Sequence, residues 1–232
     1  MLKTSNIKKS FPSGFTLGPC QLHFYEGEAI AILGKNGAGK STLFQLLTAN
    51  LDPSSGEILF RGERLRPEHS EIRKHIGYLP QNMQLPSWVS GLELLSYAQS
   101  LNSSVIRKTR VEEWMHYWDC YDYRKTPLSI CSYGMQKRIA LALATLHEPA
   151  CMILDEPFSG LDLFHVKALE DLITLRKREG KLSILSSHVI PFVSKLCDRV
   201  VLLHKGVPLE LEGWSKVDEA SRSSQIELQF FS

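Results

Sequence analysis

The sequence contains no apolar stretch long enough to cross a membrane and no Cys-x-x-Cys pair. A helix that spans a bilayer needs roughly 18 or more consecutive apolar residues, and segment 139–144 is among the longest uncharged apolar runs here. The five cysteines are scattered, which argues against a zinc site and against a disulfide framework. Because segment 1–6 also lacks the apolar core of a signal peptide, we expect a cytosolic protein.

A large excess of either charge is missing as well. The formal net charge is +2, so there is no global electrostatic reason to expect a nucleic-acid partner. Hydrophobic residues make up 43% of the chain and charged residues 22%, which is ordinary for a globular protein. The 232 residues are enough to bury a sizeable core in one or two domains.

The clearest motif present is a glycine-rich stretch that follows an apolar, strand-like run, 29–33, and precedes a helical pattern, 42–47. Glycines allow a tight turn in which several backbone N–H groups converge on phosphate oxygens. The helix start adds the positive end of its dipole. The residues predicted to surround the phosphates are Gly34, Lys35, Asn36, Gly37, Ala38, Gly39, Lys40, Ser41 and Thr42.

Two side chains of this loop predict nucleotide chemistry. Lys40 supplies a positive charge for the β- and γ-phosphates, and the Ser41 hydroxyl is a ligand for Mg²⁺. Further along, the apolar, strand-like segment 150–154 ends at Asp155 and Glu156. An Asp delivered by a buried strand holds Mg²⁺ in phosphate-loop nucleotidases, and an adjacent Glu can orient and deprotonate the attacking water.

Three other positions are candidates with an open alternative. His188 follows the strand-like segment 182–187, where it can contact the transferred phosphate, although a single His is more often structural. Gln81 follows the strand-like segment 76–80, at the edge where open α/β sheets bind ligands, but an ordinary loop residue is the alternative. Phe11 precedes the phosphate loop and can stack on a purine ring or belong to the core.

A second anion site is predicted where Ser132 and Gly134 open a helical pattern that continues to Leu146. Unpaired N–H groups at such a helix start attract an anion, and an ordinary capped helix is the alternative. Segment 90–123 has helical spacing without strands, which predicts a small helical subdomain inserted in an α/β body.

Taken together, the order of these motifs resembles the nucleotide-binding subunit of an ATP-binding cassette (ABC) transporter, over about residues 3–212. Six motifs in this order, at family-like intervals, carry the resemblance. They are Walker A at 34–42, the Q-loop at Gln81, the ABC signature at 132–136, Walker B at 151–156, the D-loop at 159–162 and the switch histidine at His188.

The resemblance implies an α/β fold, with a P-loop ATPase core built on a mostly parallel sheet, an N-terminal antiparallel β subdomain and an inserted α-helical subdomain. The ABC ATPase domain is expected to occupy residues 1–212, with its helical subdomain at about 84–148. Residues 213–232 are expected to form a C-terminal extension.

The resemblance also implies a head-to-tail dimer with a second copy or a related ATPase subunit. Each ATP then lies between Walker A of one subunit and the signature of the other, where Ser132 and Gly134 contact the γ-phosphate. A monomer is expected to bind ATP but to hydrolyse it poorly. The implied roles are adenine stacking for Phe11, Mg²⁺ binding for Ser41, Gln81 and Asp155, general base for Glu156, γ-phosphate contact for His188, and communication across the dimer for Asp162.

Transmembrane permease subunits are the other implied partners, so the chain is expected on the cytoplasmic face of the membrane. In the family these subunits dock at the helical insertion, where Met83, Leu85, Trp88 and Val89 are candidate groove residues; packing within the insertion is the alternative. The signature departs from the commonest family pattern, Leu-Ser-Gly-Gly-Gln, at Cys131, Tyr133 and Met135. Its Ser-x-Gly-Met form is similar to branches associated with export, and it keeps Ser132 and Gly134, so both sites of a homodimer are expected to hydrolyse ATP.

Three other functions are compatible with a phosphate loop. A soluble single-cassette ABC ATPase, acting in cofactor assembly or macromolecular remodelling without a membrane partner, remains the alternative. A non-hydrolysing ATP-gated module is expected to lack Glu156 or His188, and both are present. The signature-like segment, the Asp155–Glu156 pair and the absence of a guanine-reading Asn-Lys-x-Asp sequence argue against a phosphate-loop kinase or GTPase.

Overall fold

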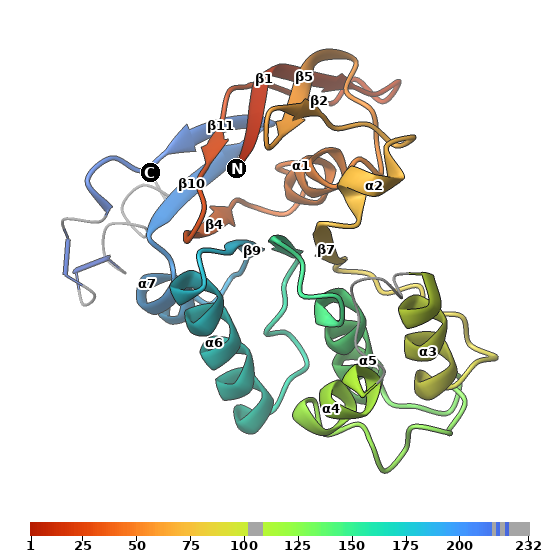
Figure 1. Cartoon of the computed structure of the whole chain (residues 1–232). Coiled ribbons are helices and arrows are strands. Elements are labelled where there is room, and N and C mark those ends of the chain that lie inside the picture. Colours follow the sequence, from red (N-terminus) through yellow and green to blue (C-terminus); the bar gives the residue numbers. More distant parts are fainter. Residues whose placement is uncertain (102–108, 215–216, 219–220, 223–232) are drawn as a thin grey trace.

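The computed structural model describes residues 1–101, 109–214, 217–218 and 221–222, and two sheets organise it (Figure 1). The smaller sheet is antiparallel, with the strand order β2-β1-β5-β6, and β3 also pairs with β1. Its strands are β1 (Leu2–Ser10), β2 (Thr16–Cys20), β3 (His23–Phe24), β5 (Ser55–Phe60) and β6 (Glu63–Arg64).

The larger sheet has the order β11-β10-β4-β9-β8-β7 and is parallel except for the β10–β11 pair. Its strands are β4 (Ala29–Leu33), β7 (Ile76–Leu79), β8 (Cys151–Leu154), β9 (Leu182–Ser186), β10 (Arg199–His204) and β11 (Val207–Glu210). Every residue of β4, β8 and β9 is buried. Parallel strands that are covered on both faces have this uninterrupted apolar character.

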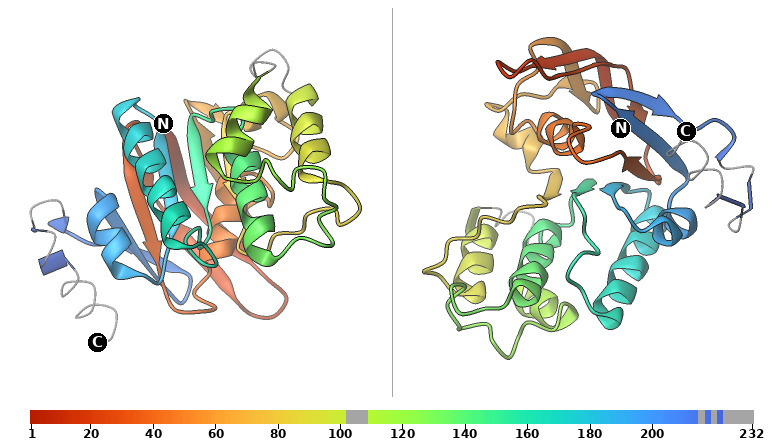
Figure 2. Two further views of the ribbon diagram at one scale, coloured as in Figure 1. Left: turned by 90° about the horizontal axis from the view of Figure 1, so that it is seen from below. Right: turned by 180° about the vertical axis from the view of Figure 1, so that it is seen from behind.

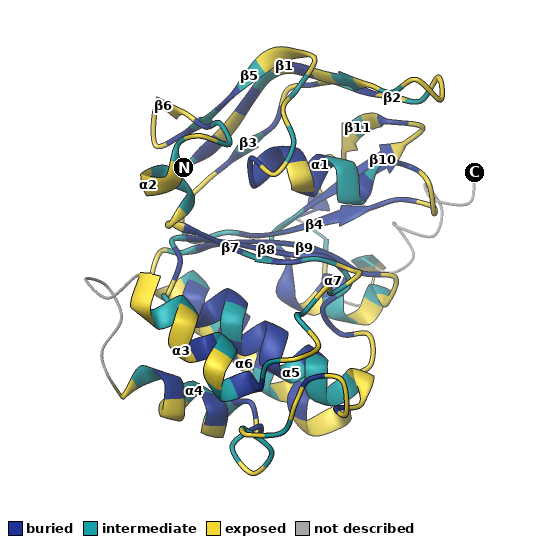
Figure 3. Cartoon of the chain, turned by 90° about the vertical axis from the view of Figure 1, so that its right-hand side faces the viewer, coloured by how far each residue is buried: buried dark blue, intermediate teal, exposed yellow. Residues whose placement is uncertain are grey.

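Side chains that alternate along β4 enter two different hydrophobic cores. Ile30 and Ile32 pack with α1 (Lys40–Leu47) and the smaller sheet, whereas Ala29, Ala31 and Leu33 belong to the core on the other face. This follows from the two-residue period of a strand. Helix α1 therefore lies between the two sheets, and the longer helices cover the opposite face of the larger sheet (Figure 3).

The helices on that opposite face include the predicted insertion. Helices α3 and α4 contact α5, and together they form a group away from the smaller sheet (Figure 2). The predicted fold class is confirmed by the two sheets and this helical group. The remaining helices are α2 (Ser70–Arg73), α3 (Gly91–Leu101), α4 (Arg110–Tyr117), α5 (Tyr133–Thr145), α6 (Leu163–Arg178) and α7 (Ile190–Leu196).

The beginning of the expected C-terminal extension packs onto the larger core. Trp214 is buried, and its Nε1–H donates a hydrogen bond of 2.9 Å to the carbonyl oxygen of Cys197. Arg222 donates to the carbonyl oxygen of Ser194 at 2.8 Å and lies over the Trp214 ring. The rest of segment 213–232 lies outside the described residues, apart from 213, 217, 218 and 221. Within the described ranges, no helix combines the length and the apolar character that a bilayer crossing requires.

Candidate nucleotide-binding site

The glycine-rich loop connects β4 to α1, as predicted. Gly37 and Gly39 have φ values of +80° and +105°, in the region that favours glycine. The Lys40 ammonium donates a hydrogen bond of 2.6 Å to the Gly34 carbonyl oxygen, which holds the side chain along the loop. Burial lowers the pKa of Lys40, and the carboxylates of Glu156 and Asp155 act in the opposite direction.

One pocket follows this loop and contains most of the residues predicted to surround the phosphates. Ala38 is buried and, like Gly34, does not line the pocket. The pocket is lined by Phe15, Lys35, Asn36, Gly37, Gly39, Lys40, Ser41, Thr42 and Gln81. Backbone N–H groups, the two lysines and small side chains are the features that bind a polyphosphate.

The sheet order brings the other predicted residues to the same edge of the larger sheet as the phosphate loop. Strand β9 lies between β4 and β8, and β8 pairs with β7. Gln81, Asp155 and His188 follow the carboxyl ends of β7, β8 and β9. In open parallel sheets the carboxyl edge is where ligands bind, so three segments far apart in the sequence meet beside the phosphate loop.

Asp155 is fully buried and accepts hydrogen bonds from two hydroxyl groups. The Ser41 hydroxyl donates to its Oδ2 at 2.7 Å, and the Ser186 hydroxyl donates to its Oδ1 at 2.6 Å. Gln81 lines a second pocket together with Ser41 and Asp155. Mg²⁺ is usually bound by one or two protein oxygen ligands with phosphates and water, so this set of hydroxyl, carboxylate and amide oxygens fits the ion.

Glu156 and His188 form the pair next to the buried Asp155. The His188 Nε2 lies 3.1 Å from the Glu156 Oε1, and the glutamate side chain is only 12% exposed while the histidine is 51% exposed. The Glu156 N–H donates a hydrogen bond of 2.8 Å to the Ser186 hydroxyl. The carboxylate therefore has a histidine beside it, although neither Glu156 nor His188 lines the two pockets beside the phosphate loop.

Phe11 and Phe15, which both precede the loop, take different places. Phe15 lines the phosphate-loop pocket, and its ring lies 2.9 Å from the point where a Cβ on Gly39 would be. Phe11 is half-buried and its ring centroid is 6.2 Å from that of Phe15. Phe11 does not line the phosphate-loop pocket, and its stacking on a base remains a prediction.

The signature segment begins α5. Ser132 is the N-cap of this helix, because its hydroxyl accepts a hydrogen bond of 3.3 Å from the Met135 N–H. The helix-cap prediction is thus confirmed. Gly134 lies close to the D-loop, with the Gly160 carbonyl oxygen 3.3 Å from the point where its Cβ would be. Neither Ser132 nor Gly134 lines the two pockets beside the phosphate loop.

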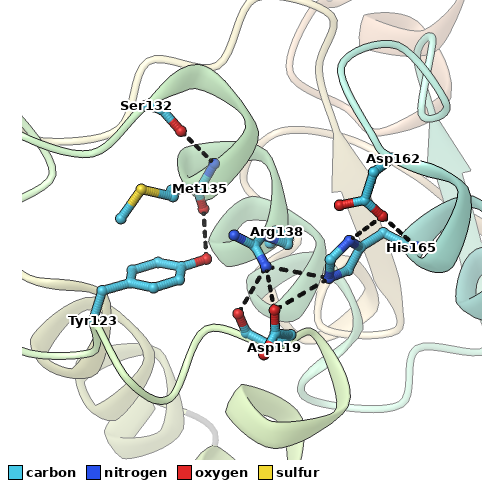
Figure 4. A network of polar contacts seen from close by, with 7 residues as sticks. All are labelled: Asp119, Tyr123, Ser132, Met135, Arg138, Asp162 and His165. Atoms are coloured by element: carbon cyan, nitrogen blue, oxygen red, sulfur yellow. Dashed lines mark hydrogen bonds and ion pairs between the residues drawn. The ribbon is translucent and has the colours of Figure 1, made fainter.

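A polar network joins the signature helix to the D-loop (Figure 4). Asp162 caps α6, with its Oδ1 3.0 Å from the His165 N–H and 2.7 Å from the His165 Nδ1. Hydrogen bonds from the His165 backbone and ring lower the pKa of Asp162. Arg138 lies 3.2 Å from the His165 Nε2 and donates to Asp119 at 2.7 Å. The Asp162 carboxylate therefore has partners within its own chain.

Sequence reasoning missed three residues that the structure adds to the site, namely Phe15, Lys137 and Ser186. Ser186 lies two residues before His188, and its strand neighbour Leu185 pairs with Leu154, immediately before Asp155. A correct strand pairing would therefore have placed it level with the carboxylate. Lys137 donates to the carbonyl oxygen of Glu156 at 3.0 Å. Lys137 lies three residues after Gly134, and residues at that spacing share a helix face. This spacing could have assigned Lys137 to the same side of the helix as the signature glycine.

Fold and site together define an ATP-binding domain of the phosphate-loop ATPase class. A family model described as ABC transporter matches residues 17–159. An uncharacterised ABC transporter ATP-binding protein of Nostoc sp. is 33% identical over 217 residues, which are 89% of this chain and 64% of that protein. Another from Methanocaldococcus jannaschii is 31% identical over 224 residues, which are 95% of this chain and 79% of that protein.

The chain belongs to the ABC transporter family, and it carries that family's ATP-binding, ATPase domain. A solved dimer of the ATP-binding cassette MJ0796 with ADP and phosphate superposes with a TM-score of 0.82 at 23% identity, covering 92% of this chain and 100% of that one. This likeness establishes the shared fold.

The chain spans about two thirds of the length of the Nostoc relative and nearly four fifths of the length of the Methanocaldococcus jannaschii relative.

Proposed function

We propose that this chain binds and hydrolyses ATP as the ATPase subunit of an ABC transporter, and that it acts as a dimer around two Mg-ATP. The observation that carries the proposal is the direct contact between the phosphate loop and the strand-end carboxylate, Ser41 Oγ to Asp155 Oδ2 at 2.7 Å. Beside it, Glu156 lies 3.1 Å from His188. Loop, metal-binding carboxylate, base and histidine are the parts that phosphoryl transfer to water requires.

In this proposal the residues of one chain prepare the in-line attack of water on the γ-phosphate. The loop N–H groups and Lys40 bind the phosphate oxygens and stabilise the charge that builds up on them. Glu156 accepts the proton of the attacking water, and His188 holds the γ-phosphate. Ser41, Gln81 and Asp155 would hold Mg²⁺, which would supply positive charge beside the phosphates.

The second half of each site comes from a partner subunit in the same proposal. Ser132 and Gly134 lie outside the pockets beside the phosphate loop, yet they begin a helix that is suited to an anion. In a head-to-tail dimer, Ser132 and Gly134 of this chain would contact the ATP that is bound to the phosphate loop of the partner. The partner is a second copy or a related ATPase subunit, and both sites of a homodimer are competent because the signature keeps Ser132 and Gly134.

The membrane partner is proposed to dock at the segment after Gln81. Trp88 is 80% exposed there, whereas Met83, Leu85 and Val89 pack partly against the core. An exposed tryptophan beside the Q-loop supports a contact with a permease subunit. The chain would then lie on the cytoplasmic face of the membrane, with export as the direction that the Ser-x-Gly-Met signature favours. Domain limits at 1–212 and 84–148 are part of this proposal.

The ATPase part is tested with Glu156→Gln. ATP turnover is expected to fall by roughly 10²- to 10⁴-fold, as for loss of a general base, while binding of a fluorescent ATP analogue persists. Glu63→Gln is a matched control, because it makes the same chemical change at an exposed residue of β6, in the smaller sheet, that lines neither pocket beside the loop. Unchanged turnover in Glu156→Gln would remove Glu156 as the base.

The transporter part needs a separate experiment. The Glu156→Gln chain is purified from solubilised membranes with ATP, and the proteins that accompany it are identified. A polytopic membrane protein in stoichiometric amount supports the transporter. A soluble partner, or none, would favour a soluble cassette while leaving the ATPase assignment intact.

A further inference from the structure

Lys137 is a lysine with no exposed surface, in the second turn of α5. Its Nζ donates a hydrogen bond of 3.0 Å to the main-chain carbonyl oxygen of Glu156. Its partner is thus a neutral backbone oxygen and not a carboxylate. Loss of hydration makes a buried ammonium costly, and burial lowers the pKa of Lys137 to about 8, while Asp155 and Glu156 act in the opposite direction.

A long apolar side chain would fill the same volume without that cost. Methionine, for example, adapts to irregular core spaces and carries no charge to desolvate. Packing alone therefore gives no reason for an ammonium at this position. The hydrogen bond to Glu156 is the interaction that an apolar residue could not make.

The main chain at Glu156 is in a conformation that needs such support. Its φ is +49°, which is unfavourable for a residue with a Cβ. On one side the N–H donates to the Ser186 hydroxyl at 2.8 Å. On the other, the carbonyl oxygen accepts from Lys137 at 3.0 Å and from the Ser159 N–H at 3.3 Å. Because the backbone sets the direction of the Cα–Cβ bond, these bonds aim the Glu156 side chain.

The same lysine belongs to the signature helix. It lies three residues after Gly134, so both are on one face of α5. Helix α5 begins at the Ser132 cap and runs without interruption to Thr145. A single helix therefore carries both the Gly134 end of the signature and the lysine that bonds Glu156.

We infer that Lys137 is a positioning residue, which aims the Glu156 carboxylate by holding the Glu156 carbonyl oxygen. The inference rests on the proposed function, because it needs Glu156 as the base that activates water. Lys137 itself contacts neither nucleotide nor water in this role. It joins the signature helix to the catalytic carboxylate of the same chain.

The test is a double-mutant cycle on the full chain with Lys137→Met, Glu156→Gln and both changes together. Lys137→Met is expected to lower kcat by roughly ten- to a hundredfold, as for a small misplacement of a reacting group. The KM for ATP is expected to change much less. In the Glu156→Gln background, measured with radiolabelled ATP over hours, the same change is expected to cost less than about twofold, because residues that act as a unit are not additive.

Thr145→Val is the matched control on the same helix. Thr145 is buried, and its hydroxyl donates to the Leu141 carbonyl oxygen at 2.6 Å, away from Glu156. Its kcat is expected to stay at the wild-type value for the folded protein, which is quantified by circular dichroism.

Two results would overturn the inference, and they differ. An equal loss in both backgrounds would mean that Lys137 acts by a route other than Glu156, with the proposed function intact. Full turnover in Glu156→Gln would show that Glu156 is not the base, and it would exclude the positioning role of Lys137 as well.

Discussion

The ring of Tyr133 lies directly against Gly160, so that a Cβ on the glycine would be 2.7 Å from the Tyr133 Cε1 and 2.9 Å from its Cδ1. The tyrosine occupies a signature position where the commonest family pattern has glycine, and Gly160 belongs to the D-loop segment. The Tyr133 ring thus fits because Gly160 has no side chain. Gly160 also has a φ of +76°, which favours glycine independently.

Gly160→Ala is expected to lower the free energy of unfolding by more than the cost of placing an alanine in the left-handed backbone conformation. The conformation costs about 1–2 kcal/mol, and contact with the ring adds less than the cost of overpacking in a core, about 1–3 kcal/mol, because Tyr133 is half exposed and its ring can move. Gly180→Ala is the control for conformation, because Gly180 has a φ of +71° and no atom within 4 Å of its Cβ position. Urea unfolding measures both variants. In a Tyr133→Ala background the two losses are expected to become equal; a difference that persists there would contradict the Tyr133 contact.

Ser186→Ala is expected to lower both stability and turnover. The hydroxyl serves Asp155 and the Glu156 N–H, and leaving such buried groups without a partner costs about 1–3 kcal/mol. Turnover is expected to fall by at least roughly tenfold, since misplaced reacting groups are costly.

Ser183→Ala is its control, because Ser183 is equally buried on β9 but accepts only from the Arg176 side chain among the described contacts. Arg176 keeps its bonds to the carbonyl oxygens of Pro149 and Leu182. Turnover per folded molecule is expected to be normal in Ser183→Ala. Normal turnover in Ser186→Ala as well would show that this hydroxyl does not align the carboxylates.

The stability difference between Lys137→Met and wild type is expected to depend on pH. The pKa of Lys137 is about 8 in the folded protein against an ordinary 10.5. Between these values the unfolded chain binds more protons, so the free energy of unfolding of the wild type rises with pH. The full effect is roughly 3 kcal/mol. Below about pH 8 the buried lysine is charged, and the free energy of unfolding of the wild type carries the whole penalty. Methionine at this position carries no such penalty.

The measurement is urea unfolding of both proteins between pH 7 and pH 10. Any advantage of Lys137→Met at pH 7 is expected to shrink as the pH rises, since other groups titrate equally in both proteins. A difference that stays constant over this range would contradict the depressed pKa of the buried lysine.

Phe11 and Phe15 are separated by comparing ATP with inorganic tripolyphosphate. Phe11→Ala is expected to weaken ATP binding by about fivefold, as for loss of one aromatic stack, and to leave tripolyphosphate binding unchanged. Phe15→Ala is expected to weaken both ligands, because its ring supports the loop at Gly39. Isothermal titration calorimetry measures the four affinities. Equal weakening of both ligands by Phe11→Ala would exclude base stacking.

The sequence by itself determined the phosphate loop and its surroundings. An apolar run, spaced glycines and a helical pattern are local signals, and the structure forms β4, the loop and α1 from them. The same holds for the Ser132 cap and for the strand that ends at Asp155, because capping and strand burial depend on neighbours within a few residues. The order of the motifs then indicated the family.

Only the tertiary structure decided which side chains touch. Ser41 and Asp155 are 114 positions apart in the sequence. They meet because β4 and β8 are parallel strands on either side of β9, so that their carboxyl ends share one edge of the sheet. No periodicity in the sequence reports strand order, so Ser186 went unnoticed although it bonds both carboxylate residues. The bond from Lys137 to Glu156 likewise depends on how α5 packs beneath the strand ends. Pairings between distant segments arise from the burial of whole faces, which spacing within one segment does not encode.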